Sequence, residues 1–157
     1  MGEEAPFDVI LLVWTTILEY YNHSADIEII RGIRRLLRKG GLFIVTNTAS
    51  YEFLAHKMEV NPVENVYSNL GDFVVIEQHK LDPVKGKMAT EWKFYRKRGE
   101  DLIYVDKVSF EIGLYTIHEL VRIVESSGFK LIRAYKSMLD MSPVTPLSPI
   151  NLVFKAL

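Results

Sequence analysis

The stretch Phe7-Asp-Val-Ile-Leu-Leu-Val-Trp14 is a continuous apolar run, and Leu42-Phe-Ile-Val-Thr46 is a second one. Runs of this kind predict strands that are covered on both faces, as in a parallel sheet. Between the two runs, apolar residues recur at helical spacing, namely Ile27, Ile30, Ile33 and Leu37. A strand, a helix and a strand in this order predict a βαβ unit with a right-handed crossover.

The residues at the two ends of this helix favour a start near Ser24 and a stop at Gly40-Gly41. Serine is a typical N-cap residue, and Asp26 and Glu28 would lie in the first turn, where the helix dipole favours negative charge. Glycine readily adopts the left-handed backbone conformation that ends many helices. We therefore expect a helix from Ser24 to the glycine pair.

The middle of the chain carries signals of a different kind. Ser50 predicts the cap of a short helix, which Asn61-Pro62 would end, followed by a loop. From there on the apolar period changes to two, and turn sequences separate strands expected at 73–81, 88–97 and 102–112. This pattern predicts a three-stranded antiparallel meander.

The last part of the chain returns to the helical period. Thr116-Ile-His-Glu119 is a capping box, with Tyr115 and Leu120 placed as its hydrophobic staple. The helix that it opens is expected to stop at Gly128, and the strands 129–135 and 150–154 follow. The fold class expected is α/β, a partial doubly wound sheet with the meander inserted.

Length and composition limit the classes of protein. The chain has 157 residues, 19 Lys and Arg against 20 Asp and Glu, and no cysteine. This length suits one domain, which we divide into 1–49, 50–71, 72–113 and 114–157. The balanced charge favours neither a nucleic-acid nor an anionic-membrane partner. Without cysteine there is no disulfide or thiolate metal site, which suits the cytoplasm, and no metal site is expected.

Three parts of the chain together resemble the class I S-adenosylmethionine-dependent methyltransferases. The strand at Phe7, the helix ending in Lys39-Gly40-Gly41 and the strand at Leu42 are similar to the family's fourth strand, its following helix and its fifth strand. Tyr115-Thr-x-x-Glu-Leu120 and Ser127-Gly-Phe129 resemble its next helix and sixth strand. The meander between them looks like the lid insertion of small-molecule methyltransferases. The resemblance implies S-adenosylmethionine as cofactor and a small-molecule acceptor.

One part of the family pattern is missing from these residues. The family holds its cofactor mainly on a glycine-rich turn after its first strand and on an acidic residue after its second. Of the nine glycines here, none forms such a loop. The chain therefore matches the carboxy-terminal half of the fold, and cofactor binding is expected to need an amino-terminal half or a partner.

The carboxyl end of the first strand carries the residues expected to bind the cofactor. Ligands of open α/β sheets bind beyond the carboxyl ends of the strands, which singles out Trp14, Thr15 and Thr16. Trp14 could lie beside the adenine or the sulfonium methyl, or it could be a core aromatic that closes the strand. The two threonines could bind a carboxylate or simply lead into a turn.

The substrate-binding residues expected are Asn47, Tyr51 and Tyr115. Asn47 could orient the acceptor or act only as a turn residue. Tyr115 could reach the acceptor with its hydroxyl or serve only as the staple of its helix. The catalytic residue stays open: the candidate bases are Glu19, His23, His56, His79 and Glu91, each with the alternative of a solvated or hydrogen-bonded side chain.

Two functions from different classes follow. The first is methyl transfer to a small molecule, and the alternative is a non-catalytic interaction module that keeps half of an enzyme fold. Phosphate-loop, zinc-protease and nucleophile-elbow motifs are absent from the sequence. In the family's strand order the missing first strand would lie beside Phe7–Trp14, so this strand becomes an edge. We expect a homo-oligomer that pairs or buries the edge.

Overall fold

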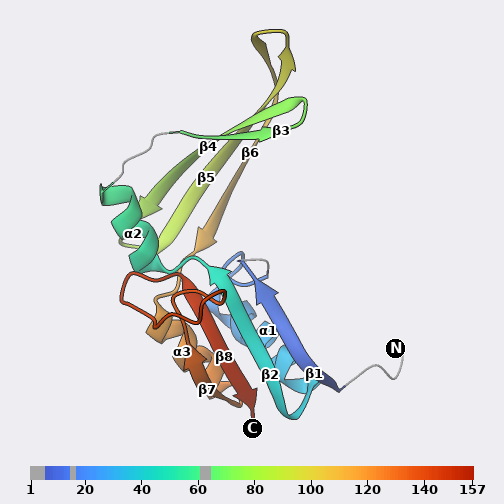
Figure 1. Ribbon diagram of the computed structural model, residues 1–157, viewed down its shortest axis with the longest axis vertical. Coiled ribbons are helices and arrows are strands. Elements are labelled where there is room, and N and C mark those ends of the chain that lie inside the picture. Colours follow the sequence, from blue (N-terminus) through green and yellow to red (C-terminus); the bar gives the residue numbers. More distant parts are fainter. Residues whose placement is uncertain (1–5, 15–16, 61–64) are drawn as a thin grey trace. The chain divides into compact units, whose positions relative to one another are not determined.

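The structure is a computed structural model that describes residues 6–14, 17–60 and 65–157. The chain divides into two compact units (Figure 1). The first unit contains Met1–His56 and Leu114–Leu157, and the second contains Lys57–Gly113. Each unit is built around its own four-stranded sheet. The α/β class and the inserted antiparallel segment predicted from the sequence are confirmed.

The sheet of the first unit has the strand order β1-β2-β8-β7. These strands are β1 (Phe7–Val13), β2 (Leu37–Thr48), β7 (Phe129–Ala134) and β8 (Ile150–Ala156). β1 and β2 run parallel, whereas β8 runs antiparallel to both of its neighbours. The parallel pair with a helix between its strands is the βαβ unit that the two apolar runs predict.

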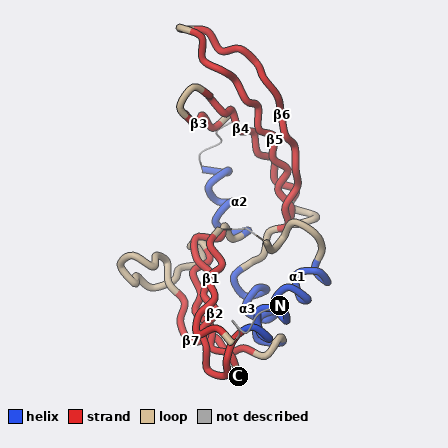
Figure 2. Tube along the Cα trace, turned by 90° about the vertical axis from the view of Figure 1, so that its right-hand side faces the viewer, coloured by secondary structure: helices blue, strands red, loops and turns tan. Residues whose placement is uncertain are grey.

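Two helices cover one face of this sheet. Figure 2 shows α1 (His23–Leu36) and α3 (Ile117–Ser126) on the same side of β1, β2 and β7. Apolar residues from both helices and from the strands form one buried core between the layers. Its largest fully buried members are Ile30, Phe43, Leu120, Phe129, Ile150, Leu152 and Phe154. Both helices present an apolar stripe to the sheet because their apolar residues recur every three or four positions.

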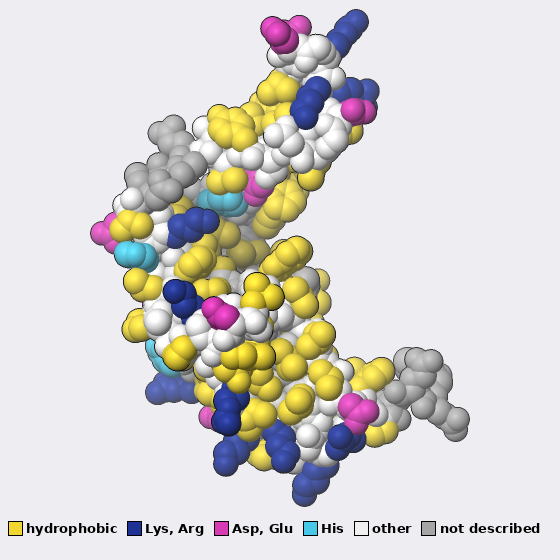
Figure 3. Space-filling model, viewed as in Figure 1, with side chains coloured by type: hydrophobic (Ala, Val, Ile, Leu, Met, Phe, Trp, Pro, Cys, Tyr) yellow, Lys and Arg dark blue, Asp and Glu magenta, His cyan; other side chains and the backbone are white. Residues whose placement is uncertain are grey.

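The opposite face of this sheet is open, which corrects one expectation. The first strand was expected to be covered on both faces, but Phe7, Val9, Leu11 and Val13 are exposed and only Leu12 is buried. Side chains alternate between the faces of a strand, so the exposed residues share one face. In Figure 3, hydrophobic side chains gather over this side of the sheet. A continuous apolar run indicates that both faces of a strand are covered. It does not show which segments of polypeptide cover them.

The ends of α1 differ from those expected. Asn22, not Ser24, is the N-cap: its side-chain oxygen accepts a hydrogen bond from the N–H of Ala25 at 3.0 Å. The helix ends at Leu36, and β2 begins before the glycine pair. Gly41 lies where a Cβ atom would approach the backbone oxygens of Asp8 and Arg38 to 3.0 Å, so its role is to permit close backbone contact in the sheet.

The second unit is an antiparallel sheet in the order β3-β4-β5-β6. Its strands are β3 (Val66–Leu70), β4 (Phe73–Asp82), β5 (Lys87–Arg98) and β6 (Asp101–Gly113). The three strands of the expected meander are present. The prediction of a loop before them is wrong, because β3 pairs with β4 from Val66↔Glu77 to Leu70↔Phe73. A strand of five mostly exposed residues carries too little apolar alternation to be recognised alone.

The starts of the other two predicted helices are confirmed, whereas Asn61-Pro62, expected to end the first of them, lies outside the described residues. α2 (Tyr51–Val60) begins after Ser50, whose hydroxyl oxygen accepts the N–H of Phe53 at 3.1 Å. At the start of α3 both halves of the capping box between Thr116 and Glu119 form. Among the helices that the structure describes, none combines the length and the apolar character needed to cross a membrane.

Candidate functional site

Two predicted residues mark the carboxyl ends of the parallel strands β1 and β2. Trp14 follows β1 with φ 56°, and Asn47 lies at the end of β2 with φ 55°. Trp14 donates its N–H to Thr46 O and accepts the Thr48 hydroxyl at its own carbonyl, both at 2.9 Å. Its indole is 66% exposed, so it is not the core aromatic of the alternative interpretation. The left-handed backbone at Trp14 comes directly after β1, whereas Asn47 lies within β2, at the irregularity in the pairing with β8 between Val45 and Thr48.

A buried amide holds the end of β2 in place. The Asn151 side-chain oxygen accepts the Thr46 hydroxyl and the Asn47 N–H, each at 2.9 Å. The Asn151 side-chain nitrogen donates to Lys136 O at 3.0 Å. Asn151 lies on β8 and is 1% exposed, so one side chain connects β2 to the loop after β7. Sequence reasoning missed this residue, because an asparagine in a short strand carries no motif.

The two predicted tyrosines are brought together through the backbone. The Tyr51 N–H, at the start of α2, donates to Tyr115 O at 3.0 Å. The Tyr115 N–H donates in turn to Glu19 Oε1 at 2.8 Å, and its hydroxyl donates to Asp26 Oδ2 at 2.7 Å. Tyr115 also packs against the core, so it has the apolar contacts of a staple together with a polar contact at its hydroxyl.

A pair of buried carboxyl groups lies beside Tyr115. Glu19 and Asp26 are 6% and 2% exposed, and the Glu19 N–H lies 3.1 Å from both carboxylate oxygens of Asp26. Within the described residues, Glu19 Oε2 is buried and has no hydrogen-bond partner. Burial, and more weakly the nearby Asp26, raises the pKa of Glu19 from 4.5 to about 8, against the lowering effect of the Tyr115 N–H. Glu19 is therefore mostly protonated at neutral pH.

The candidate bases separate into different places. Glu19 is not a solvated side chain, since its carboxyl is buried. His23, the first residue of α1, lies with Nδ1 3.3 Å from the Tyr115 hydroxyl. His56 is exposed on α2, and His79 and Glu91 belong to β4 and β5 of the second unit. Of these five candidates, only Glu19 and His23 contact the predicted residue Tyr115.

The structure therefore brings part of the predicted site together. Tyr115 and Tyr51 are in contact, and Trp14 and Asn47 follow neighbouring strands. Thr15 and Thr16 lie outside the described residues. The sequence indicates Asp26 only as a first-turn acid of α1, because periodicity does not reveal that its side chain is buried against a tyrosine 89 positions later.

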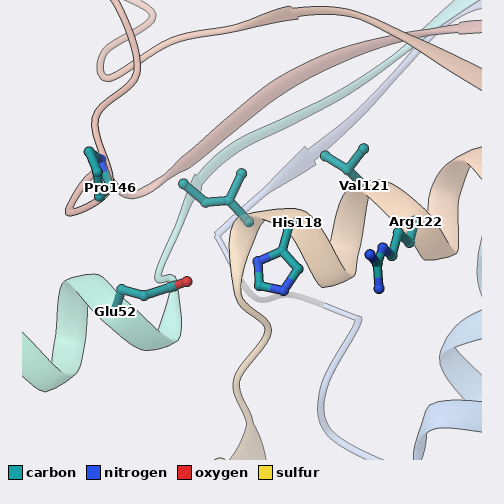
Figure 4. A pocket seen from close by; sticks show the side chains of 6 residues that line it. Glu52, His118, Val121, Arg122 and Pro146 are labelled. Atoms are coloured by element: carbon teal, nitrogen blue, oxygen red, sulfur yellow. The ribbon is translucent and has the colours of Figure 1, made fainter.

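A separate hollow lies on the surface of the first unit. Figure 4 shows it between Glu52 on α2 and the first turns of α3. Its lining residues are Glu52, Ile117, His118, Val121, Arg122 and Pro146, none of which the sequence predicted as a site. In the described parts of the chain, no group of three or more His, Asp or Glu side chains is arranged to hold a metal ion.

A scan against protein-family models found no match, and a search of curated proteins found none either. Solved structures do match. One S-adenosylmethionine-dependent methyltransferase from Clostridium acetobutylicum aligns at 13% identity and a TM-score of 0.76, over 99% of this chain and 61% of its own. The CcbJ methyltransferase from Streptomyces caelestis aligns at 17% identity and a TM-score of 0.71, over 99% of this chain and 59% of CcbJ. The sugar N-methyltransferase KedS8 from a Streptoalloteichus species aligns at 10% identity and a TM-score of 0.62, over 100% of this chain and 58% of KedS8.

These matches identify the fold. Along nearly its whole length the chain is similar to part of the fold of S-adenosylmethionine-dependent methyltransferases, as the sequence resemblance implies. It spans about three-fifths of the length of the solved structures that it matches.

Proposed function

We propose that this chain takes part in methyl transfer from S-adenosylmethionine to a small-molecule acceptor. The observation that carries the proposal is a methyltransferase-like sheet whose parallel strands end at an exposed tryptophan and at polar side chains fixed by hydrogen bonds. Methyl transfer is an in-line displacement at a sulfonium carbon, and correct positioning supplies much of its acceleration. Groups that are held rigidly at the carboxyl ends of neighbouring strands suit that task.

The residues at the carboxyl ends of β1 and β2 fit one part of the cofactor. The exposed indole of Trp14 offers an aromatic surface on which an adenine could stack, and its backbone is held by two hydrogen bonds to β2. When bound, S-adenosylmethionine would supply the electrophilic methyl group. We assign Trp14, with Thr15 and Thr16, to the cofactor side, and Asn47, Tyr51 and Tyr115 to the acceptor side.

A further polypeptide segment completes the cofactor site in this proposal. None of the nine glycines forms the loop on which the family holds the cofactor. The solved structures extend well beyond the matched part, and the open face and free edge of β1 remain for a covering segment. We propose that the segment, in the same polypeptide or in a partner, brings the glycine-rich loop.

Cofactor binding tests this proposal directly. Titration calorimetry on the protein purified from its native source, together with any partner that co-purifies, is expected to detect S-adenosylmethionine binding. Trp14→Ala should weaken binding by about 1–3 kcal/mol, which is roughly 5- to 150-fold, through loss of stacking. Trp92→Phe, in the second unit, is the matched control and should leave the affinity unchanged. Absence of binding in the native protein would contradict the proposal.

The alternative function is a non-catalytic interaction module that keeps half of the fold. The missing glycine-rich loop favours it. Intact-mass measurement of the native protein separates the two functions when it is combined with the calorimetry. A native product of this length that binds no cofactor would favour the module, whereas a longer product or a co-purified partner that restores binding would favour the enzyme.

The free edge of β1 predicts self-association of the isolated chain. β1 pairs only with β2 among the described strands, and its open face is apolar. Such edges pair with other chains. Sedimentation at micromolar concentration is expected to give a dimer or a larger species, and Leu11→Lys should shift it to the monomer. Leu36→Lys, on the exposed side of α1, should not. A monomeric wild-type chain would overturn this prediction.

A further inference from the structure

A chain of three side chains links the protein surface to a buried carboxylate in the first unit. His23 Nδ1 lies 3.3 Å from the Tyr115 hydroxyl oxygen, which lies 2.7 Å from Asp26 Oδ2. Asp26 is almost fully buried, Tyr115 is half-buried and His23 is exposed. His23 begins α1, which follows β1 at the end of the sheet where ligands of open α/β folds bind.

The positions of the protons along this chain follow from the donors that each group possesses. The Asp26 carboxylate accepts from two donors: the single Glu19 N–H, shared between its two oxygens, and the Tyr115 hydroxyl. Tyr115 has a single hydroxyl proton, and it is donated to Asp26. Burial and the bond to Asp26 raise the pKa of Tyr115, which keeps that proton in place. The Tyr115 oxygen is then an acceptor toward His23.

This assignment fixes the tautomer of the imidazole. Because the Tyr115 oxygen accepts, His23 Nδ1 must carry the hydrogen, and the basic lone pair of the neutral ring lies on Nε2. A carboxylate that orients a histidine through its Nδ1–H is a recurring arrangement for general bases. Here a tyrosine hydroxyl stands between the carboxylate and the ring.

We propose that His23 is the general base for the methyl acceptor, with Tyr115 and Asp26 as its positioning residues and a protonated amine as the acceptor class. This inference rests on the proposed methyl transfer. The acceptor ammonium gives one proton to His23 Nε2 and becomes a neutral amine. The amine lone pair then forms the new N–C bond as the S–C bond of the sulfonium breaks and its electrons remain on sulfur. The exposed imidazolium returns the proton to solvent.

The charges around His23 suit this role. Asp26 on α1, behind Tyr115, and Glu119 on α3 are the acidic groups near the ring, Glu19 is mostly protonated, and His118 lies near Glu119. Negatively charged neighbours attract a cationic acceptor toward this part of the surface. Of the solved structures, the KedS8 relative acts on a sugar nitrogen, which agrees with an amine acceptor.

The tautomer of His23 gives a test that needs neither cofactor nor acceptor. Long-range proton–nitrogen correlation spectra of the isolated chain are expected to show His23 with hydrogen on Nδ1 and none on Nε2. Tyr115→Phe should remove this preference and leave the spectrum of His56 unchanged. A His23 ring with its hydrogen on Nε2 in the wild-type protein would overturn the proposal.

Rates test the catalytic part in protein that binds S-adenosylmethionine. His23→Gln is expected to lower kcat for an amine acceptor by about 10²- to 10⁴-fold, with partial rescue by added imidazole after His23→Ala. The control His56→Gln should retain the wild-type rate. An unchanged rate in His23→Gln would overturn His23 as base but leave methyl transfer intact. Absence of cofactor binding would instead contradict the proposed function. The tautomer measurement would still test the arrangement of His23, Tyr115 and Asp26.

Discussion

The free energy of unfolding is expected to fall by roughly 3–4 kcal/mol between pH 5 and pH 8 because of Glu19 alone. In the folded chain burial raises the pKa of this carboxyl to about 8, whereas its ordinary value is 4.5. The folded state therefore holds a proton that the unfolded chain releases in this window. Stability is lost as the pH rises from 4.5 toward 8, and this contribution levels off above pH 8.

Glu19→Gln isolates that contribution. The amide oxygen can still accept the Tyr115 N–H, and the side chain no longer ionises, so the variant should show a flatter profile and greater stability at pH 8. Urea unfolding at several pH values, followed by circular dichroism, measures the difference between the two proteins. All other titrating groups are common to both and cancel. Parallel profiles for wild type and variant would contradict the buried, protonated state of Glu19.

Phe43→Ala is expected to lower the free energy of unfolding by about 3–5 kcal/mol, because it removes a large buried ring and leaves a cavity. Phe43 is fully buried, and its ring lies 5.6 Å from that of Phe129 and 6.1 Å from that of Phe154. The loss would be a large fraction of the 5–15 kcal/mol that stabilises a typical domain.

The matched control for this variant is Leu36→Ala. Leu36 ends α1 and is 45% exposed, so its truncation should change the free energy of unfolding by less than about 0.5 kcal/mol. Both variants are compared at one protein concentration, because self-association makes the unfolding midpoint depend on concentration. A Phe43→Ala protein as stable as the Leu36→Ala protein would mean that this core is not packed as described.

The elements predictable from the sequence are those with strong local signals. The apolar runs of β1 and β2 and the capping box of Thr116 and Glu119 lie where the pattern places them. Weak local signals gave wrong predictions: β3 lacks enough alternating apolar residues, and Asn22 and Ser24, two positions apart, could each cap α1. The choice between two such caps depends on how the preceding loop approaches the helix.

The candidate site was only partly predictable for the same reason. Trp14 and Asn47 could be named, because the end of a strand is readable from where an apolar run stops. Asn151 and Asp26 could not, because each acts through a partner about 90 to 105 positions away in the chain. His23 was one of several candidate bases until its contact with Tyr115 distinguished it.

The α/β class, the βαβ unit, the inserted antiparallel strands, the resemblance to methyltransferases and the lack of a glycine-rich loop all follow from the amino-acid sequence. The three-dimensional structure is needed to show which face of the sheet is covered and which carboxyl groups are buried. It is also needed to show that Asp26, Tyr115 and His23 form one chain of contacts. The physical reason is that periodicity and capping are local properties of the backbone, whereas burial and side-chain hydrogen bonds depend on segments that meet only when the chain has folded.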